Sequence, residues 1–407
     1  MRLLHTQSLS LSEFYGDDIP PYAILSHRWG QEEVTFDDLT KGLAPTRQGF
    51  AKLQGFCKQA AADGFEYCWV DTCCIDKSSS AELSEAINSM FSWYQNSEVC
   101  LVYLQDVDSS LDPNLSTTSI NNSLEPIPNS LSTSEWFARG WTLQELVAPF
   151  VVSFHGSDWR CIGSRTTLGP ILAGITSIDL RFFETLDLST YTIAQRMSWA
   201  AKRKTTRIED QAYCLMGLFG INMPLLYGEG ERAFKRLQEE IIRQSTDFSI
   251  FAAPTEARFQ SDSFLAARPA AFTLGANITT QRDRILEIIS RKINQSTIES
   301  VPDYGTSITS RGIVVTLPFV QKKLSSVRSW IYPAFQEVGQ PWLLETFFND
   351  SFWNFKLALL NCCVGNHAIG VILSENQEGG VFFKSATENG GPQQQVEIAV
   401  YGQAKMG

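Results

Sequence analysis

The chain lacks the short motifs that mark the commonest metal, phosphate and hydrolase sites. Its four histidines are far apart and its nine cysteines include no C-x-x-C pair, so neither a zinc finger nor an H-E-x-x-H protease is indicated. The phosphate-binding G-x-x-x-x-G-K-[ST] loop and the G-x-S-x-G turn of serine hydrolases are also missing. We therefore expect no metal and no bound cofactor.

Long apolar runs and an excess of positive charge are missing as well. No stretch of 18 apolar residues exists, which predicts no membrane span, and the N-terminus lacks the apolar centre of a signal peptide. A formal net charge of −11 argues against nucleic acid as a partner. The adjacent pairs Cys73–Cys74 and Cys362–Cys363 do not suit a disulfide framework. We expect a cytoplasmic protein whose cysteines are mostly reduced and buried.

What the sequence does contain is a regular alternation of strand and helix patterns in its first 160 residues. Apolar runs predict four strands, at Tyr22–Ser26, Tyr67–Asp71, Val99–Leu104 and Phe150–Phe154. Helical spacing predicts helices over Gly49–Ala62 and after the Ser79-x-x-Glu82 capping box. Strands alternating with helices predict an α/β fold, a parallel sheet with helices on both faces. A polar stretch, about 106–132, is predicted to be a mobile insertion.

The rest of the chain divides into two further parts that differ in their pattern of apolar residues. Residues 161–250 carry helical periodicity, and residues 251–407 carry short β-type runs separated by Gly, Asn and Glu. We therefore predict three parts, an α/β domain over 1–160, a helical segment over 161–250 and a β-rich region over 251–407. Residues Gly228 and Gly230 precede a predicted helix but follow no strand, so we expect a helix-entry loop rather than a phosphate site.

Polar and aromatic residues gather where the predicted strands end, which is where open α/β sheets place their sites. Three groups make up this candidate site: Ser26, His27, Arg28, Trp29 and Gly30; Asp71 and Asp76; and Arg139, Trp141 and Glu145. A Trp face can stack on a base, an Arg can pair with a phosphate, and a carboxylate can bind ribose hydroxyls or stabilise an oxocarbenium-like centre. The set therefore suits a nucleoside or nucleotide.

Each of these residues also has a structural interpretation that the sequence leaves open. Thr142-x-x-Glu145 fits a capping box, so Glu145 can simply cap a helix. Arg139 can pair with Glu135 four residues earlier. His27, Asp71 and the two tryptophans can hold loops or pack at the edge of the core, and Cys73 or Cys74 can either pair with His27 as a nucleophile or pack as small apolar groups.

Three long segments resemble the signature blocks of the fungal HET (heterokaryon incompatibility) domain. They are YAILSHRWG from Tyr22, YCWVDTCCIDKSSSAELSEAINSMFSWY from Tyr67 and SEWFARGWTLQELVAP from Ser134. The segment from Arg196 to Ile241 is similar to the one that commonly follows, so the resemblance covers about residues 1–250. It implies a fungal protein of self/non-self recognition that triggers regulated cell death through self-association or partner proteins.

The resemblance also implies a distant relation to the TIR fold, which is a flavodoxin-like parallel sheet. Many TIR domains cleave NAD⁺ at its nicotinamide–ribose bond with a Glu from a Ser-x-Trp-Cys-x-x-Glu-Leu pattern. Ser134-Glu135-Trp136 and Gln144-Glu145-Leu146 are similar, although the Gly140-Trp141 region separates them. The resemblance thus makes Glu145 the expected catalytic residue, with Trp29 or Trp141 stacking on a ring, Arg139 and Ser26 on phosphate or ribose, and His27, Gly30 and Asp71 shaping the loops. The alternative is a non-catalytic module that signals by assembly.

Overall fold

We analysed a computed structural model of the chain, which divides into two compact units. Unit 1 comprises Met1–Leu188 and Arg203–Gly230, and unit 2 comprises Ser189–Lys202 and the chain from Glu231 onward. The structure describes residues 1–108, 129–252 and 265–280, and beyond these the backbone of six strands between 305 and 400. Most of the expected insertion, residues 109–128, lies outside the described residues, and the predicted three-part division stays a prediction.

Unit 1 contains a seven-stranded sheet of mixed direction. Its strands are β1 (Arg2–His5), β2 (Leu11–Glu13), β3 (Tyr22–His27), β4 (Tyr67–Trp69), β5 (Val99–Tyr103), β6 (Val152–His155) and β7 (Cys161–Ser164). They lie in the order β2-β1-β4-β3-β5-β6-β7. The four strands expected from the sequence are parallel neighbours in the middle, and β1, β2 and β7 pair antiparallel at the two ends. The α/β prediction is confirmed, and the expectation of a wholly parallel sheet is wrong at both edges.

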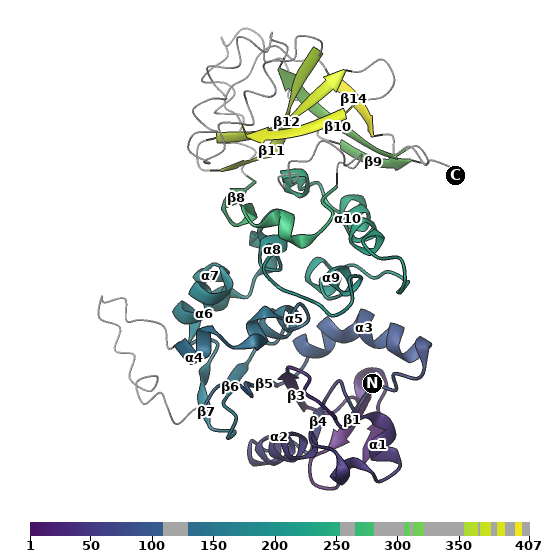
Figure 1. The fold of residues 1–407 in the computed structure, drawn as a ribbon, viewed down its shortest axis with the longest axis vertical. Helices are drawn as coiled ribbons and strands as arrows, with labels where there is room; N and C mark the ends of the chain where they lie inside the picture. Colours follow the sequence, from purple (N-terminus) through teal and green to yellow (C-terminus); the bar gives the residue numbers. More distant parts are fainter. Residues whose placement is uncertain are drawn as a thin grey trace, which may run out of the picture. The chain divides into compact units, whose positions relative to one another are not determined.

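The strand order explains why helices cover both faces of the sheet. From β3 the chain crosses to β4 on one side through α2 (Phe50–Ala62), and from β4 it returns past β3 to β5 through α3 (Ser80–Gln95). Since crossovers between parallel strands are right-handed as a rule and these two run in opposite directions, the two helices are expected on opposite faces. In Figure 1, α3 and α5 (Thr142–Val147) lie on one side of the strands and α2 on the other.

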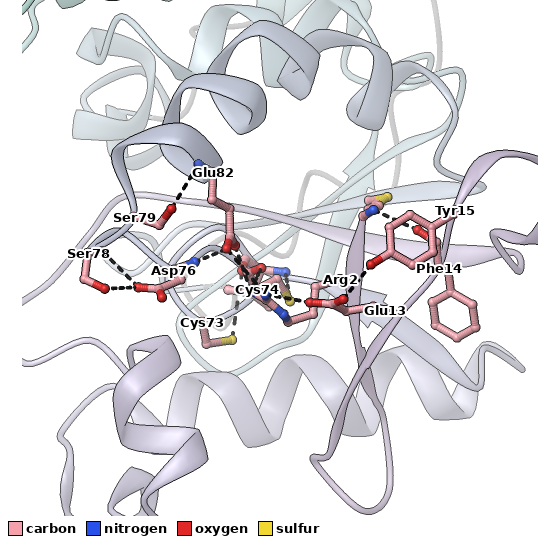
Figure 2. Close-up of polar contacts among 12 residues, drawn as sticks. Arg2, Glu13, Phe14, Tyr15, Cys73, Cys74, Asp76, Ser78, Ser79 and Glu82 are labelled. Atoms are coloured by element: carbon pink, nitrogen blue, oxygen red, sulfur yellow. Dashed lines mark hydrogen bonds and ion pairs between the residues drawn. The ribbon is translucent and has the colours of Figure 1, made fainter.

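Residues 2–13 form the β1–β2 hairpin, which was not among the strands predicted from the sequence. Leu3 and Leu4 are fully buried, and β1 pairs with β4. Figure 2 shows Arg2 reaching from this hairpin between Glu13 and Glu82, with its guanidinium also donating to the Cys74 carbonyl. The contacts of Arg2 with Cys74 and Glu82 span more than seventy residues of sequence, so no local pattern could have indicated them.

The same contacts change the role of Glu82. The Ser79 hydroxyl accepts from the Glu82 amide as a cap should. The Glu82 carboxylate, however, accepts from Arg2 and from the Asp76 amide, both at 2.7 Å. The predicted capping box is therefore only half formed, because Arg2 and the Asp76 amide hold the Glu82 carboxylate. Glu82 thereby fixes the turn that follows β4.

Helices and short turns complete unit 1. They are α1 (Phe36–Thr40), α4 (Asn129–Ser132), α6 (Gly169–Thr176), α7 (Leu180–Thr185) and α9 (Asp210–Tyr213), with 3₁₀ turns η1 (Gly16–Asp18), η2 (Ala44–Thr46), η4 (Glu135–Ala138) and η6 (Gly217–Phe219). The stretch from Ile208 to Phe219, which lies in the segment predicted to be helical, contains the two short elements α9 and η6. The buried core includes Trp69, Trp136, Tyr94, Tyr213, Phe56 and Phe154.

Unit 2 joins short helices to a second sheet. Its elements are α8 (Ile193–Ser198), α10 (Arg232–Gln244), η7 (Phe248–Ala252), η8 (Pro269–Phe272), η9 (Gly275–Asn277), β8 (Ile278–Thr279), β9 (Gly305–Thr309), β10 (Gly312–Val320), β11 (Asn354–Val364), β12 (His367–Glu375), β13 (Val381–Ala386) and β14 (Gln395–Val400), and η5 (Leu188–Thr190) lies at the boundary between the units. The sheet has the order β13-β12-β11-β10-β14, and its pairs are antiparallel. Only the backbone is described beyond residue 304, so the predicted β-rich region stays a prediction.

No helix in the described parts of the chain is long and apolar enough to cross a membrane.

Replacing Arg2 with Met should destabilise unit 1. The Arg2 side chain is 14% exposed and its main partner Glu82 is 30% exposed, so the substitution leaves a half-buried carboxylate without its cation. We expect a loss of about 1–3 kcal/mol in the free energy of unfolding, measured by urea denaturation. Arg181→Met is the matched control, because Arg181 is 79% exposed beside Asp179, and it should cost less than about 0.5 kcal/mol. Equal losses in the two variants would contradict the assignment.

Candidate functional site

Three elements meet at Ser26, near the carboxyl end of β3. The Trp136 indole N–H of η4 donates to the Ser26 Oγ at 2.9 Å, and the Ser26 hydroxyl donates to Glu145 Oε2 of α5 at 2.5 Å. All three side chains are buried. Because the indole can only donate, it orients the serine hydroxyl toward the carboxyl group. Strand end, 3₁₀ turn and helix are thus joined by one directed pair of hydrogen bonds.

The Glu145 carboxyl is buried, and burial favours its neutral form. It is 7% exposed, and burial raises its pKa from 4.5 to about 8, against the opposing effect of the Ser26 hydrogen bond. The Asp71 charge raises the pKa further, and the charges of Arg139 and Arg203 lower it. At neutral pH, therefore, this carboxyl group is mostly protonated.

The turn before α5 is fixed by residues far along the chain. Arg203 donates to the Arg139 carbonyl and to the Thr142 hydroxyl, both at 2.9 Å. The backbone of Lys204 bonds to both Ala138 and Gly140. Gly140 allows this approach, because a Cβ there would lie 2.5 Å from Thr205 Cγ2. Residues 203–205 therefore position the start of the helix that carries Glu145.

The predicted capping box at Thr142 is wrong. The helix begins at Thr142 itself, and its N-cap is Trp141, whose side chain makes no capping bond. The Thr142 hydroxyl donates backward to the Trp136 and Arg139 carbonyls. The Glu145 carboxyl is thereby released from capping and bonds to Ser26 instead.

A second cluster is centred on Asp71, two residues beyond β4. His27 Nε2 lies 3.1 Å from Asp71 Oδ1, and the Trp29 indole donates to Asp71 Oδ2 at 2.8 Å. Lys77 Nζ lies 3.6 Å above the centre of the Trp29 ring. Burial alone would raise the pKa of Asp71, but the His27 bond, the Lys77 charge and the Trp29 bond outweigh it and lower the pKa to about 2. Asp71 is therefore an ionised carboxylate.

His27 is held in one tautomer by this carboxylate. Burial and the charge of Lys52 lower the pKa of the imidazole, and Asp71 opposes them, so the ring is neutral at pH 7. Because the ionised Asp71 can only accept, Nε2 carries the proton and Nδ1 is left as an acceptor. That Nδ1 is buried and has no hydrogen-bond partner within the described residues.

The remaining predicted site residues mostly contact partners outside these two clusters. The Gly30 amide donates to Glu33, whose carboxylate also pairs with Lys52. Trp141 is half-buried and its indole bonds to Asp210. Arg139 acts on Glu145 through its charge, and the alternative pairing of Arg139 with Glu135 is wrong, since Glu135 pairs with Arg28. Asp76 bonds to Ser78 in its own turn.

Sequence reasoning missed four residues that shape the site. Trp136 orients Ser26, Lys77 covers Trp29, Arg203 holds the turn before α5, and Asp106 accepts from the Ser134 hydroxyl and the Glu135 amide at the entrance to η4. Trp136 and Lys77 lie inside the segments that resemble the HET domain, so that resemblance could have pointed to them. Arg203 and Asp106 act through contacts that no local spacing reveals.

The structure bears on two other possible sites in the sequence, a cysteine nucleophile and a phosphate-binding loop. Cys73 and Cys74 are buried and bond to the backbone of Val70 rather than to His27, so they pack as small apolar groups. The Gly228 and Gly230 amides both donate to the Glu209 carboxylate, which takes the place that an anion would need. No group of three metal-binding side chains occurs in the parts of the chain that the structure describes.

Comparisons with known proteins agree with the segments that build this site. The family model "Heterokaryon incompatibility protein (HET)" matches residues 22–145, a range that begins with β3 and ends at Glu145. The chain is 45% identical over 231 residues to "Vegetative incompatibility protein HET-E-1" of Podospora anserina. That match covers 55% of this chain and 16% of the relative, so the chain spans about a sixth of that protein's length. No solved structure matches the chain.

Replacing Glu145 with Gln should change how stability depends on pH. The folded protein keeps the Glu145 proton up to about pH 8, whereas the unfolded chain loses it near 4.5, so this group's contribution to stability declines between these values as pH rises. The Gln variant lacks this decline. Relative to wild type its free energy of unfolding should rise from pH 5 to pH 8, by on the order of 3 kcal/mol, as measured by urea denaturation at several pH values.

The control for this substitution is Glu135→Gln, which changes the same functional group on an exposed side chain. It should shift the free energy of unfolding by no more than about 0.5 kcal/mol. A difference between wild type and Glu145→Gln that stays constant from pH 5 to pH 8 would show that Glu145 is not held protonated.

Proposed function

Since residues 22–145 form a heterokaryon incompatibility (HET) domain, we propose that the chain acts in fungal self/non-self recognition and triggers cell death by hydrolysing NAD⁺. The proposed reaction releases nicotinamide at the site around Glu145. We place this activity in the cytoplasm, controlled by self-association or by partner proteins. The cited relative is named for vegetative incompatibility, and this supports the biological part of the proposal.

The strand order supports a TIR-like site. The parallel strands of unit 1 lie in the order β4-β3-β5-β6, which in chain order is the 2-1-3-4 arrangement of flavodoxin-like sheets. In such sheets ligands bind beyond the carboxyl ends of the strands, beside the strand where the order reverses. Ser26 and His27 end that strand here, and Asp71 follows its neighbour.

One observation carries the chemical part of the proposal. A carboxyl group with a raised pKa, Glu145, is aligned by Ser26, while a second carboxylate with a lowered pKa, Asp71, acts on it electrostatically. Two carboxyl groups whose environments push their pKa values apart are a recurrent feature of catalytic sites. The environment of Glu145 also suits a cationic ligand, because a nearby positive charge favours the ionised carboxylate.

NAD⁺ supplies such a charge on its nicotinamide ring. In the proposed reaction the bond between the ribose C1′ and the ring nitrogen breaks, and its electron pair leaves with neutral nicotinamide. Glu145, ionised by the approach of the cation, stabilises the oxocarbenium-like ribose. Water then adds to C1′, and its proton passes to Glu145 or to solvent, which yields ADP-ribose. Ser26 orients the carboxyl group, Trp29 offers a partly exposed ring, 43% accessible, and Arg139 contributes positive charge.

A second candidate function is favoured by the low exposure of Glu145, which is 7%. In this alternative the Ser26–Trp136–Glu145 network only joins β3 to α5, and the HET domain signals cell death by assembling with other copies or partners. A purely structural network predicts that substitution of Glu145 changes function only in proportion to the amount of folded protein.

The decisive measurement is nicotinamide release from NAD⁺ by the purified chain, followed by chromatography. We expect wild type to release nicotinamide and Glu145→Gln to lose at least about 100-fold in kcat while remaining folded at the assay pH, as checked by circular dichroism. Glu135→Gln, ten residues earlier and exposed, is the matched control and should retain full activity. Wild type that stays inert when concentrated would refute hydrolysis, and an active Glu145→Gln variant would refute the role of Glu145.

A further inference from the structure

A separate group of reactive side chains lies at the β6–β7 hairpin, away from the residues discussed so far. Among the cysteines whose side chains are described, Cys161 alone is exposed, and the other six are buried. Cys161 begins β7 and pairs across the hairpin with His155. Ser153 lies two residues before His155 on β6, on the same face of the sheet. A thiol, a hydroxyl and an imidazole therefore share one face of one hairpin.

Hydrogen bonds connect these three side chains in a single direction. His155 Nδ1 lies 3.1 Å from the Trp159 carbonyl, and because a carbonyl can only accept, Nδ1 must carry the proton. His155 Nε2 is then the acceptor for the Ser153 hydroxyl, 3.0 Å away. With its proton directed to the histidine, the Ser153 oxygen accepts from the Cys161 thiol at 3.5 Å. The chain of donors thus runs from Cys161 through Ser153 to His155.

Two local departures from regular structure produce this alignment. The register between β6 and β7 shifts between Phe154 and His155, so that Ile162 of β7 is passed over and His155 pairs with Cys161. Trp159, which supplies the carbonyl, has a φ of 63°, a left-handed conformation that is uncommon for a bulky residue. Bulges and residues of this kind are often found beside functional sites.

Packing around Trp159 holds that unusual backbone in place. Its ring stacks on Tyr103 at 4.7 Å between centroids and on Phe56 at 6.2 Å. It also lies against Gly55 of α2, where a Cβ would come within 2.1 Å of the indole nitrogen. The carbonyl that sets the His155 tautomer is therefore fixed by α2, β5 and the hairpin together.

The electrostatic setting suits a base. Burial lowers the pKa of His155, while its bond to the Trp159 carbonyl and the charge of Asp63 on the turn after α2 oppose this, and the net pKa lies below 6.5. The ring is consequently neutral at pH 7 and its Nε2 is able to take a proton.

We propose that Cys161 is a modification site for low-molecular-weight disulfides, activated through Ser153 by His155. The thiol proton passes to Ser153 as the Ser153 proton passes to His155 Nε2. The Cys161 thiolate then attacks one sulfur of the disulfide, whose S–S bond breaks as the new bond forms. The second sulfur leaves as a thiolate and takes the proton back from His155. Cys161 is oxidised to a mixed disulfide, and the departing thiol is the reduced product.

This proposal concerns Cys161 alone and does not depend on the proposed NAD⁺ hydrolysis. The test measures the rate at which Cys161 reacts with iodoacetamide and with glutathione disulfide at pH 7, quantified at that residue by peptide mapping. The reference is the peptide Ser157–Arg165, which contains Cys161 as its only cysteine and lacks the relay. We expect Cys161 in the folded chain to react about tenfold faster than in the peptide.

Variants separate the relay from simple exposure. Ser153→Ala and His155→Gln should each reduce the rate to about that of the peptide, and Ser153→Thr, which keeps a hydroxyl, should restore most of it. Ser157→Ala, an exposed serine in the same hairpin, is the matched control. Circular dichroism confirms that each variant is folded. The proposal is overturned if Cys161 reacts no faster than the peptide, or if folded Ser153→Ala reacts as fast as wild type.

Discussion

The hydrogen bond between Ser26 and Glu145 is the contact on which the rest of unit 1 depends. It joins the end of β3 to α5 across 119 residues of sequence. Three residues position the groups that form this bond: Trp136 orients the Ser26 hydroxyl, Asp106 holds the start of η4, and Arg203 holds the turn before α5. A buried hydroxyl or carboxyl group without a hydrogen-bond partner lowers the stability of the fold. Displacement of any one of these elements would therefore leave a buried polar group of another without its partner.

Burial has opposite outcomes for the two carboxyl groups of the site. Both are penalised by loss of water, but Asp71 is compensated by His27, Trp29 and Lys77, whereas the Ser26 hydrogen bond and the charges of Arg139 and Arg203 offset the burial of Glu145 only in part. The first remains charged at low pH and the second holds a proton near neutrality. This division gives the site a fixed negative charge beside a neutral carboxyl group, which is an arrangement suited to the proposed cationic substrate.

The sequence predicted those features that arise from local pattern. Apolar runs identified β3, β5 and β6, and helical spacing identified α2 and α3, because burial of one face imposes that period. The β1–β2 hairpin was missed, since it offers only Leu3 and Leu4 to the core and depends on Arg2 reaching Glu82. The capping box at Thr142 was wrong for the same reason: a local pattern suggested a cap, and a distant serine decided the outcome. That Asp71, His27 and Trp29 lie close together was expected from their places at the ends of predicted strands, but the position of Lys77 above Trp29 was not.

Residues 203–205, which position the start of α5, affect the order in which a newly synthesised chain forms its site. Strand β3 emerges from the ribosome early, yet Glu145 follows it by more than a hundred residues, and the backbone that secures the turn before α5 follows later still. Contacts so far apart in sequence form late in folding. A polypeptide interrupted before residue 203 would carry each signature segment without their final arrangement. If the domain kills the cell that makes it, as proposed, such a delay would keep incomplete translation products inactive.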